Sequence, residues 1–209
     1  MSAGWQVHPL TPDRWADLEA LFGEQGAAYG CWCMWWYQTD EQFYAQAGEA
    51  NRAALHALVQ GWAAPGLLGY LDGRPVGWVC VRPRDQFTRV DATPFLAPPG
   101  PDPRVWAITC FYIAADARGH GLMERLIAAA VEHAAARGAA AIEAYPIDPD
   151  CAPQERFEGG LYHTVHAHVG ILSAFARQGF EVIERRLAYR PIVRRALAPS
   201  APGGEDHVG

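Results

Sequence analysis

The sequence predicts an α/β domain with a central mixed sheet, and three observations support that prediction. First, an apolar strand runs into a glycine turn and directly on into an amphipathic helix over Ile108 to Ile127. Second, two short apolar runs, Leu67 to Leu71 and Pro75 to Arg82, flank Asp72-Gly73, and Asp-Gly is a strong signal for an antiparallel hairpin. Third, a buried strand of the parallel kind, Ala139 to Tyr145, follows the helix.

The first sixty residues are expected to hold one strand and two helices. Trp5 to Leu10 predicts a short strand. Thr11 can cap a helix and Pro12 suits its first position, so this helix is expected to run to Phe22. Asn51 to Trp62 repeats apolar residues at the helical period, and one face of that helix should therefore pack on the sheet.

A further helix is expected, with a long loop before it. The helix Leu122 to Arg137 ends at Gly138, which is a good C-terminal cap. Residues 83–103 have no clear periodicity and contain several prolines. A loop of that length is usually functional or mobile.

Composition indicates one globular domain, expected over residues 1–195, because half of the residues are hydrophobic. Residues 196–209, rich in Pro, Gly and Ala, are expected to be a disordered tail.

The formal net charge of −6 argues against nucleic acid as a partner. No apolar run is long enough for a membrane span and no export signal precedes the domain, so no membrane partner and a cytoplasmic location are expected. Five cysteines, an odd number, indicate reduced thiols rather than a disulfide framework.

Basic residues cluster near the end of the chain: Arg185, Arg186, Arg190, Arg194 and Arg195. The favoured interpretation is solvated charges on an edge strand and a tail, because basic residues commonly protect sheet edges. An anion site is the alternative.

The turn before the helix at Leu122 has the chemistry of a phosphate site. Gly119 and Gly121 have no side chain to block a close approach, and the first amides of the following helix have no intrahelical acceptor. Arg118 adds a permanent positive charge. The pattern Gly-x-x-x-x-Gly-Lys is absent, and the dinucleotide fingerprint would need a glycine where Glu124 stands, so neither a nucleoside triphosphate nor a nicotinamide cofactor is expected.

The loop Arg118 to Met123, after a strand that contains Phe111 to Ala114, resembles the pyrophosphate loop of the GNAT superfamily, the acyl-CoA-dependent N-acetyltransferases. The hairpin before it follows that family's order, and Gly170 to Phe180 resembles the family's last helix with its Gly-Phe ending, so the resemblance spans roughly residues 5–190. It implies a three-layer α-β-α fold whose mixed, mostly antiparallel sheet splays between two parallel strands. It also implies acetyl-CoA as co-substrate, an amino group of a small-molecule or peptide acceptor, and a monomer or homodimer.

The resemblance further implies which residues hold the acyl donor. The strand segment Phe111, Tyr112 and Ile113 would hold the pantetheine arm, with Phe111 and Ile113 bonding it through their backbone. The pyrophosphate would lie on Arg118 and on the amides of Gly119, His120, Gly121, Leu122 and Met123. His120 is expected to lend its amide rather than to transfer a proton. Met123 departs from the Gly or Ala that the family usually has, and its side chain could crowd the cofactor.

An aromatic run after the first helix is the acceptor candidate. Trp32, Cys33, Trp35 and Trp36 can form an apolar or cation-binding wall, or can instead fill core between two helices and the sheet. The run resembles a GNAT subgroup with a Cys-x-Cys-x-Trp segment, an Ile-x-Cys-Phe strand and a Glu-Ala-Tyr-Pro strand, which here begin at Cys31, Ile108 and Glu143.

Acetyl transfer to an amine needs a base for the ammonium proton and an acid for the departing thiolate. The family's usual acid is a tyrosine at the position of Phe175, which has no proton to donate, so Ser173 or solvent is expected to serve. Glu143 is the favoured base, with a structural ion pair as the other interpretation. Tyr145, Asp148 and His163 are weaker candidates.

Two minority hypotheses concern cysteine and histidine. Cys110 can be acylated on the strand beside the thioester, although buried cysteine usually serves packing. The spacing of His163, His166 and His168 invites a zinc site but lacks paired metal-binding spacings, so no metal is expected, and a polar loop beside the acceptor is favoured. The sequence thus predicts an acetyl-CoA-dependent N-acyltransferase, with a non-catalytic acyl-CoA-binding or sensing module as the alternative.

Overall fold

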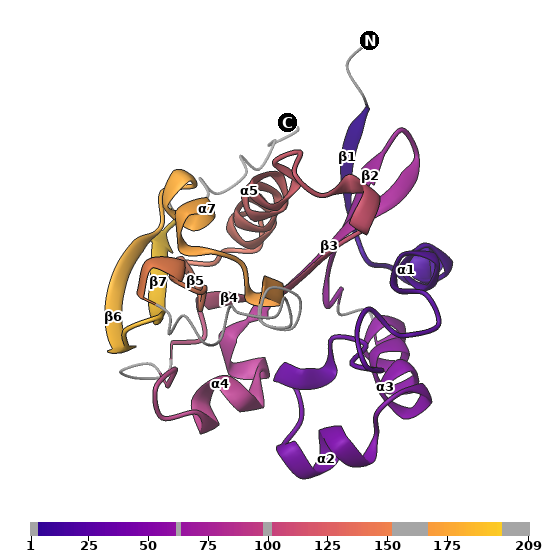
Figure 1. Ribbon diagram of the computed structural model, residues 1–209, viewed down its shortest axis with the longest axis horizontal. Coiled ribbons are helices and arrows are strands. Elements are labelled where there is room, and N and C mark those ends of the chain that lie inside the picture. The colour runs from indigo at the N-terminus through magenta and orange to yellow at the C-terminus, as the bar shows by residue number, and fades with distance from the viewer. Residues whose placement is uncertain (1–3, 62–63, 98–101, 152–166, 198–209) are drawn as a thin grey trace, which may run out of the picture.

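The computed structural model describes residues 4–61, 64–97, 102–151 and 167–197, which form one seven-stranded sheet with helices on both faces (Figure 1). The strand order is β1-β2-β3-β4-β5-β7-β6. The β4–β5 pair is parallel and the other pairs are antiparallel. The strands are β1 Trp5–Pro9, β2 Gly66–Leu71, β3 Arg74–Pro83, β4 Val105–Ile113, β5 Ala141–Ala144, β6 Glu181–Leu187 and β7 Arg190–Ala196.

Two hydrophobic cores, one on each face of the sheet, hold the helices in place. Side chains of α1 and α3 share one core with Trp78 and Cys80 of β3, and side chains of α5 and α7 share the other with Val79 and Val81 of the same strand. This alternation along β3 places the helices in two outer layers (Figure 1), so the predicted three-layer α-β-α fold is confirmed. The α-helices are α1 Trp15–Phe22, α2 Asp40–Ala45, α3 Glu49–Gln60, α4 Thr88–Ala92, α5 Leu122–Ala135 and α7 Leu172–Arg177.

The parallel strands β4 and β5 pair over only part of their length. Val105 to Ile108 pair with Ala141 to Ala144, and β4 then continues to Ile113 without β5 beside it. A bulge in the pairing of β3 and β4 lies at the same level, between Cys80 and Val81. The sheet therefore splays between β4 and β5 beyond Ile108, as predicted.

Two predicted elements differ from the observed ones. The N-terminal helix begins with a short 3-10 turn over Pro12–Arg14, and the Thr11 hydroxyl accepts a bond from Arg14 instead of capping the helix. The predicted loop at residues 83–103 contains the short helix α4, in which burial of Phe87 and Val90 stabilises the helical turn. The sequence did not predict this helix, because so short an element shows no helical period. Residues 98–101 lie outside the described part of the chain.

The interpretation of the C-terminal arginines as solvated edge charges is wrong for most of them. Strand β7 lies between β5 and β6 and is not an edge. Arg194 binds Glu143, Arg190 donates to the carbonyl oxygen of Tyr145 at 2.9 Å, and Arg195 donates to that of Gln178 at 2.7 Å. These residues instead tie β7 to its neighbours. The predicted tail begins within β7, which reaches Ala196, and residues 198–209 lie outside the described residues.

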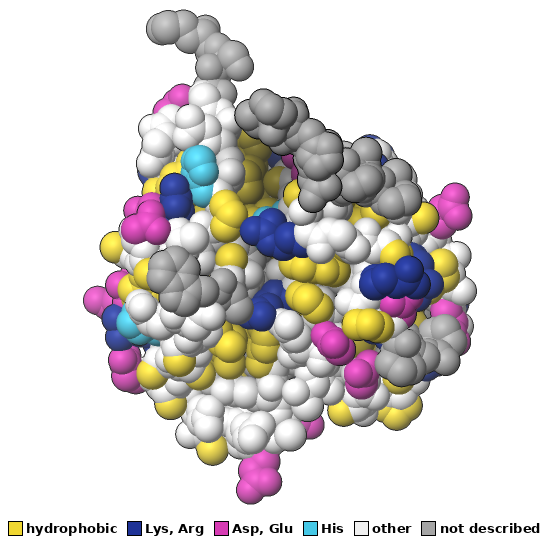
Figure 2. Space-filling view, turned by 180° about the vertical axis from the view of Figure 1, so that it is seen from behind, with side chains coloured by type: hydrophobic (Ala, Val, Ile, Leu, Met, Phe, Trp, Pro, Cys, Tyr) yellow, Lys and Arg dark blue, Asp and Glu magenta, His cyan; other side chains and the backbone are white. Residues whose placement is uncertain are grey.

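One face of the molecule is shown in Figure 2. Hydrophobic side chains gather in a hollow near the centre of this face, basic side chains lie beside them, and acidic side chains lie mostly towards the periphery. The described atoms of this face therefore form no continuous basic stripe. No helix among the described residues has the length and apolar content that a bilayer span requires.

Candidate functional site

A glycine turn brings the start of α5 to the splayed edge of β4. Gly119 and Gly121 have φ angles of +80° and +69°, in the left-handed region that favours glycine. No side chain caps α5, so the amides of its first turn point outward without a side-chain partner. The positive end of a 14-residue helix thus faces the free edge of β4.

A cavity of about 1570 Å³ runs from this turn to the opposite side of the sheet. One end is lined by the predicted donor residues Phe111, Tyr112, Ile113, Arg118, Gly119, Gly121, Leu122 and Met123. The other end is lined by Cys33, Trp35 and Trp36 of the predicted acceptor wall. Two segments that are about eighty residues apart in sequence therefore meet in one hollow.

Several predicted residues lie outside this lining. His120 is not among the described lining residues, and its ring contacts the carbonyl oxygen of Ala117 at 3.4 Å. Trp32 is buried against Trp15 and Phe22, with ring centroids 6.0 and 5.7 Å apart, as the core interpretation expects. Ser173 is also absent from the described lining. His163 and His166 lie outside the described residues, whereas His168 lines the cavity.

The acceptor wall is held by one arginine. The Arg89 guanidinium stacks over the Trp35 ring, 3.6 Å from its centroid, and donates to the carbonyl oxygens of Trp35 and Gln38 at 2.6 and 2.9 Å. It also pairs with Asp40. Arg89 belongs to α4, a helix that the sequence did not predict. This helix therefore fixes the position of the acceptor wall.

Glu143 forms a buried ion-pair network instead of facing the cavity. Its side chain is fully buried and accepts from Arg84 at 3.3 Å, from Arg194 at 2.9 Å and from the Tyr145 hydroxyl at 3.3 Å. Burial raises the pKa of Tyr145, so this hydroxyl keeps its proton. Asp148 is likewise buried and pairs with Arg185 at 2.7 Å. The geometry of Glu143 matches the structural interpretation that the sequence left open.

Phe175, at the family's usual tyrosine position, is fully buried between Phe111 and Phe180, with ring centroids 5.9 and 5.1 Å away. It therefore packs the core beneath the donor end of the cavity.

All five cysteines are free. Cys31, Cys33 and Cys110 line the cavity, and Cys80 lies opposite Cys110 on the neighbouring strand. Burial raises the pKa of the Cys31 and Cys80 thiols. The pKa of Cys33 is also raised, mainly by its hydrogen bond with Cys110. Thiols that keep their protons are weak nucleophiles, which weighs against acylation of Cys110. Among the described residues, no group of three or more His, Cys, Asp or Glu side chains has a geometry that could hold a metal ion.

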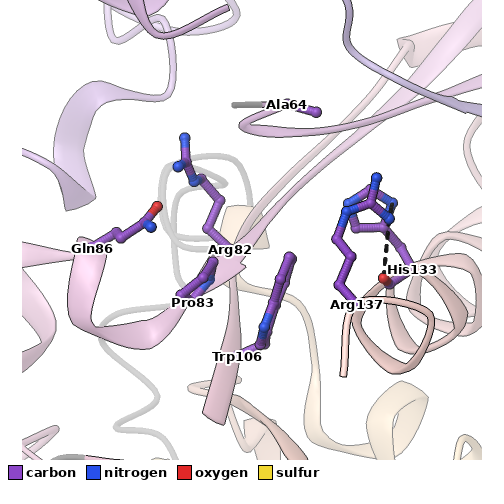
Figure 3. A pocket seen from close by; sticks show the side chains of 7 residues that line it. All are labelled: Ala64, Arg82, Pro83, Gln86, Trp106, His133 and Arg137. Atoms are coloured by element: carbon purple, nitrogen blue, oxygen red, sulfur yellow. Dashed lines mark hydrogen bonds between the residues drawn. The ribbon is translucent and has the colours of Figure 1, made fainter. Parts of the chain in front are cut away.

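A second, smaller pocket of about 200 Å³ lies at the other end of α5. Figure 3 shows Arg82 and Gln86 on one side, His133 and Arg137 on the other, and Trp106 between them. Arg137 donates to the His133 carbonyl oxygen at 3.3 Å and contacts its Nδ1 at 3.1 Å. None of the residues predicted for donor, acceptor or catalysis lines this pocket.

Solved structures of N-acetyltransferases share this fold. The PaiA N-acetyltransferase of Thermoplasma acidophilum, solved with coenzyme A, is 11% identical, with a TM-score of 0.52 over 92% of this chain and 99% of that chain. A GCN5-related N-acetyltransferase of Kribbella flavida is 18% identical, with a TM-score of 0.53 over 92% and 98%. A GNAT-family acetyltransferase of Listeria monocytogenes is 13% identical, with a TM-score of 0.54 over 94% and 99%. At these identities the likeness establishes the fold.

The fold and the family match define an acyl-CoA-dependent N-acetyltransferase, for which acyl-CoA is the co-substrate. The family model described as Acetyltransferase (GNAT) family matches residues 31–152, more than half of the chain. The chain therefore belongs to the GNAT acetyltransferase family, as its loop and strand order predicted. No curated protein sequence matches the chain.

Proposed function

We propose that the protein transfers the acetyl group of acetyl-CoA to a primary amine that carries an apolar or aromatic body. The single observation that supports this proposal is the continuous cavity between the glycine turn of α5 and the aromatic wall. The amine attacks the thioester directly, because both reactants fit in one hollow without an intermediate carrier.

For the donor, we propose that the backbone of Phe111 and Ile113 on the free edge of β4 binds the pantetheine arm, with Tyr112 between them. The amides at the start of α5 and Arg118 bind the pyrophosphate. In the structure the Arg118 Nε donates to the Ile113 carbonyl oxygen at 3.0 Å. This bond uses only Nε, so the Nη groups of Arg118 can bind the phosphates while Nε holds the loop to β4. The pyrophosphate amides belong to Gly119, His120, Gly121, Leu122 and Met123.

For the acceptor, the lining favours one amine on an apolar body over a polycation. Aromatic side chains dominate the acceptor end: Phe22, Tyr29, Trp35, Trp36, Phe43, Tyr44 and Phe95. Both carboxylates in the described lining are already paired, Asp40 with Arg89 and Glu124 with Arg177. Because a polyamine needs several carboxylates, this end of the cavity suits a single ammonium group that rests on aromatic faces.

For the base, we propose His168 in place of Glu143. A neutral imidazole accepts a proton near neutral pH, and His168 lines the cavity. Glu143 is fully buried among arginines and does not line it in the described structure.

Calorimetry with acetyl-CoA tests the donor site, with desulfo-CoA and ATP as comparators. Selective binding of both CoA compounds is expected, and absence of acetyl-CoA binding would overturn the proposal. Release of free CoA is then measured with arylalkyl amines and with polyamines at equal concentration. Arylalkyl amines should give the higher kcat/KM.

Binding without CoA release from any amine would support the alternative, a sensing module. Equal turnover of polyamines would refute the acceptor class while leaving the donor site standing. The cytoplasmic location, the single domain, the absence of nucleic-acid and membrane partners and the monomer or homodimer stay predictions.

A further inference from the structure

Three thiols meet on the wall of the large cavity. Cys80 of β3 and Cys110 of β4 lie directly opposite each other on neighbouring strands. Cys33, a loop residue with a φ of +58°, interacts with both of them. Cys80 is fully buried, whereas Cys33 and Cys110 line the cavity. The left-handed backbone at Cys33 is a costly conformation for a residue with a side chain, and it places the thiol over the strand pair.

Polar contacts surround this cluster of thiols. The Trp78 indole nitrogen, which can only donate, donates to the Cys33 sulfur at 3.2 Å. Cys33 also interacts with Cys80 and with Cys110, and the interaction with Cys33 acts to lower the pKa of Cys110. The Tyr37 hydroxyl contacts the Cys80 sulfur at 3.5 Å. Cys110 itself has only a long contact of 3.8 Å with the carbonyl oxygen of Phe111.

Cys110 lies where the two ends of the cavity meet. The pairing of β4 with β5 ends at Ile108, and Cys110 is the first residue of β4 beyond that point that lines the cavity. The proposed pantetheine segment follows it directly at Phe111. Cys31 and Cys33 of the acceptor side lie against it. A sulfur atom at the end of a pantetheine arm would therefore come next to the Cys110 thiol.

We propose that Cys110 is the proton donor to the departing CoA thiolate, and that Cys33 stabilises the Cys110 thiolate which this transfer leaves. The proposal rests on the proposed function. The amine nitrogen bonds to the thioester carbon, the carbon–sulfur bond breaks, and the sulfur takes the electron pair and then the Cys110 proton. The proton lost by the nitrogen passes to the base and returns through solvent to Cys110, so free CoA and the amide are the net products.

The donor and the leaving group are both alkyl thiols, which have similar acidity in water. The bond from Cys33 lowers the pKa of Cys110, but burial and the neighbouring Cys31 and Cys80 thiols outweigh it and leave that pKa raised. Cys110 therefore holds its proton at neutral pH. Phe175 is buried and has no proton to give.

The test compares Cys110→Ala and Cys110→Ser with Cys151→Ser, an exposed cysteine that serves as control. With an amine that the wild type acetylates, kcat of Cys110→Ala is expected to fall about 100-fold with little change in acetyl-CoA affinity, as for loss of a general acid. Cys110→Ser should not restore it, because a hydroxyl is a far weaker acid. The wild type should lose activity in the alkaline range where Cys110 deprotonates, and Cys110→Ala should not.

An unchanged kcat and alkaline limb in Cys110→Ala would overturn the inference. Failure of the wild type to release CoA with any amine would instead overturn the proposed function. A readout without any variant is alkylation of wild-type Cys110 by iodoacetamide. Saturating CoA should slow it about tenfold or more, because occupied sites exclude the reagent, and unchanged alkylation would remove Cys110 from the donor site.

Intact-protein mass after incubation with acetyl-CoA separates proton transfer from a covalent acyl-enzyme. All 17 basic Lys and Arg residues of this chain are arginine, so an acetyl adduct reports a cysteine or the N-terminal amine and not a lysine. No adduct on Cys110 is expected. A stable acetyl group on Cys110 would contradict the proton-donor role in favour of acylation.

Discussion

Burial decides what Glu143 does. A carboxylate on a strand beside the splay has the right chemistry for a base, but in the structure it is fully buried and accepts bonds from Arg84 and Arg194. Arg84 is itself only 2% exposed. Removing one partner of such a pair leaves an uncompensated buried charge, which costs far more than the pair contributes.

Glu143→Gln is therefore expected to lower the free energy of unfolding by about 3–5 kcal/mol. Denaturant unfolding measures this change, and Asp102→Asn is the matched control because the Asp102–Arg104 pair is exposed. The control should change stability little. Normal stability of Glu143→Gln combined with a loss of turnover would restore Glu143 as the base.

Burial also lowers the pKa of His133 and so favours its neutral form. Burial, with a smaller contribution from the charge of Arg137, lowers its pKa to about 4. The unfolded chain binds this proton below its ordinary pKa of 6.5, while the folded chain does so only near 4. Stability is therefore lost as pH falls from about 6.5 to about 4, and is fully present above that window.

The expected loss is of order 3 kcal/mol across this window. Replacement by a residue that does not titrate, His133→Gln, should flatten the dependence of unfolding free energy on pH between these limits. Urea unfolding at a series of pH values measures both proteins. Equal slopes for the two would mean that His133 already takes up its proton normally in the folded state.

At the scale of elements, a glycine of the same conformation lies at each end of α5, and Gly121 lines the large cavity whereas Gly138 is not among its described lining residues. Gly121 before the helix has a φ of +69° and Gly138 after it has +78°. A Cβ at either position would meet no protein atom within 4 Å. The backbone cost of a side chain is thus alike at both ends, about 1–2 kcal/mol for the left-handed region.

Gly121→Leu and Gly138→Leu form a matched pair. Both are expected to lose similar stability, because both add a side chain to a left-handed residue. Gly121→Leu alone should abolish acetyl-CoA binding, since its side chain would occupy the approach to the amides of α5. Calorimetry measures affinity and thermal unfolding measures stability. Retained affinity in Gly121→Leu would contradict the loop assignment.

Local sequence signals located most of the long elements. The Asp-Gly turn gave the hairpin of β2 and β3, and Gly138 marked the end of α5 to within a few residues. Helix α4 has five residues, too few for a period, and it is specified by the burial of Phe87 and Val90. Short elements of this kind depend on distant contacts, which one segment of sequence does not contain.

At the scale of the whole molecule, the two cores share β3, so neither can form without the sheet. Tryptophan fluorescence reports both cores, because Trp78 lies in one and Trp106 packs against the other, and it should therefore give the same unfolding transition as far-UV circular dichroism. Two separate transitions would contradict the prediction of a single domain.

The end of that domain can be tested by truncation. Leu197 donates to the Ala140 carbonyl oxygen at 2.9 Å, and Ala196 pairs with Ala141. Truncation after Leu197 should leave the melting temperature unchanged. Truncation after Arg195 should lower it by about 2–4 °C, as loss of about 1 kcal/mol does in a protein of this size. An equal melting temperature for both would place the boundary at residue 195, as the sequence predicted.

The sequence by itself determined the fold class, the loop of α5 and the family, because turns, caps and helical periods are local and leave local signals. Only the tertiary structure decided the roles of single side chains. In the structure, Glu143 is buried among arginines and Trp32 packs in the core. Cys33, Cys80 and Cys110, from three segments of the chain, lie together. Burial and charge pairing arise from residues far apart in the chain, so the chemistry of each group is fixed only when the sheet brings them together.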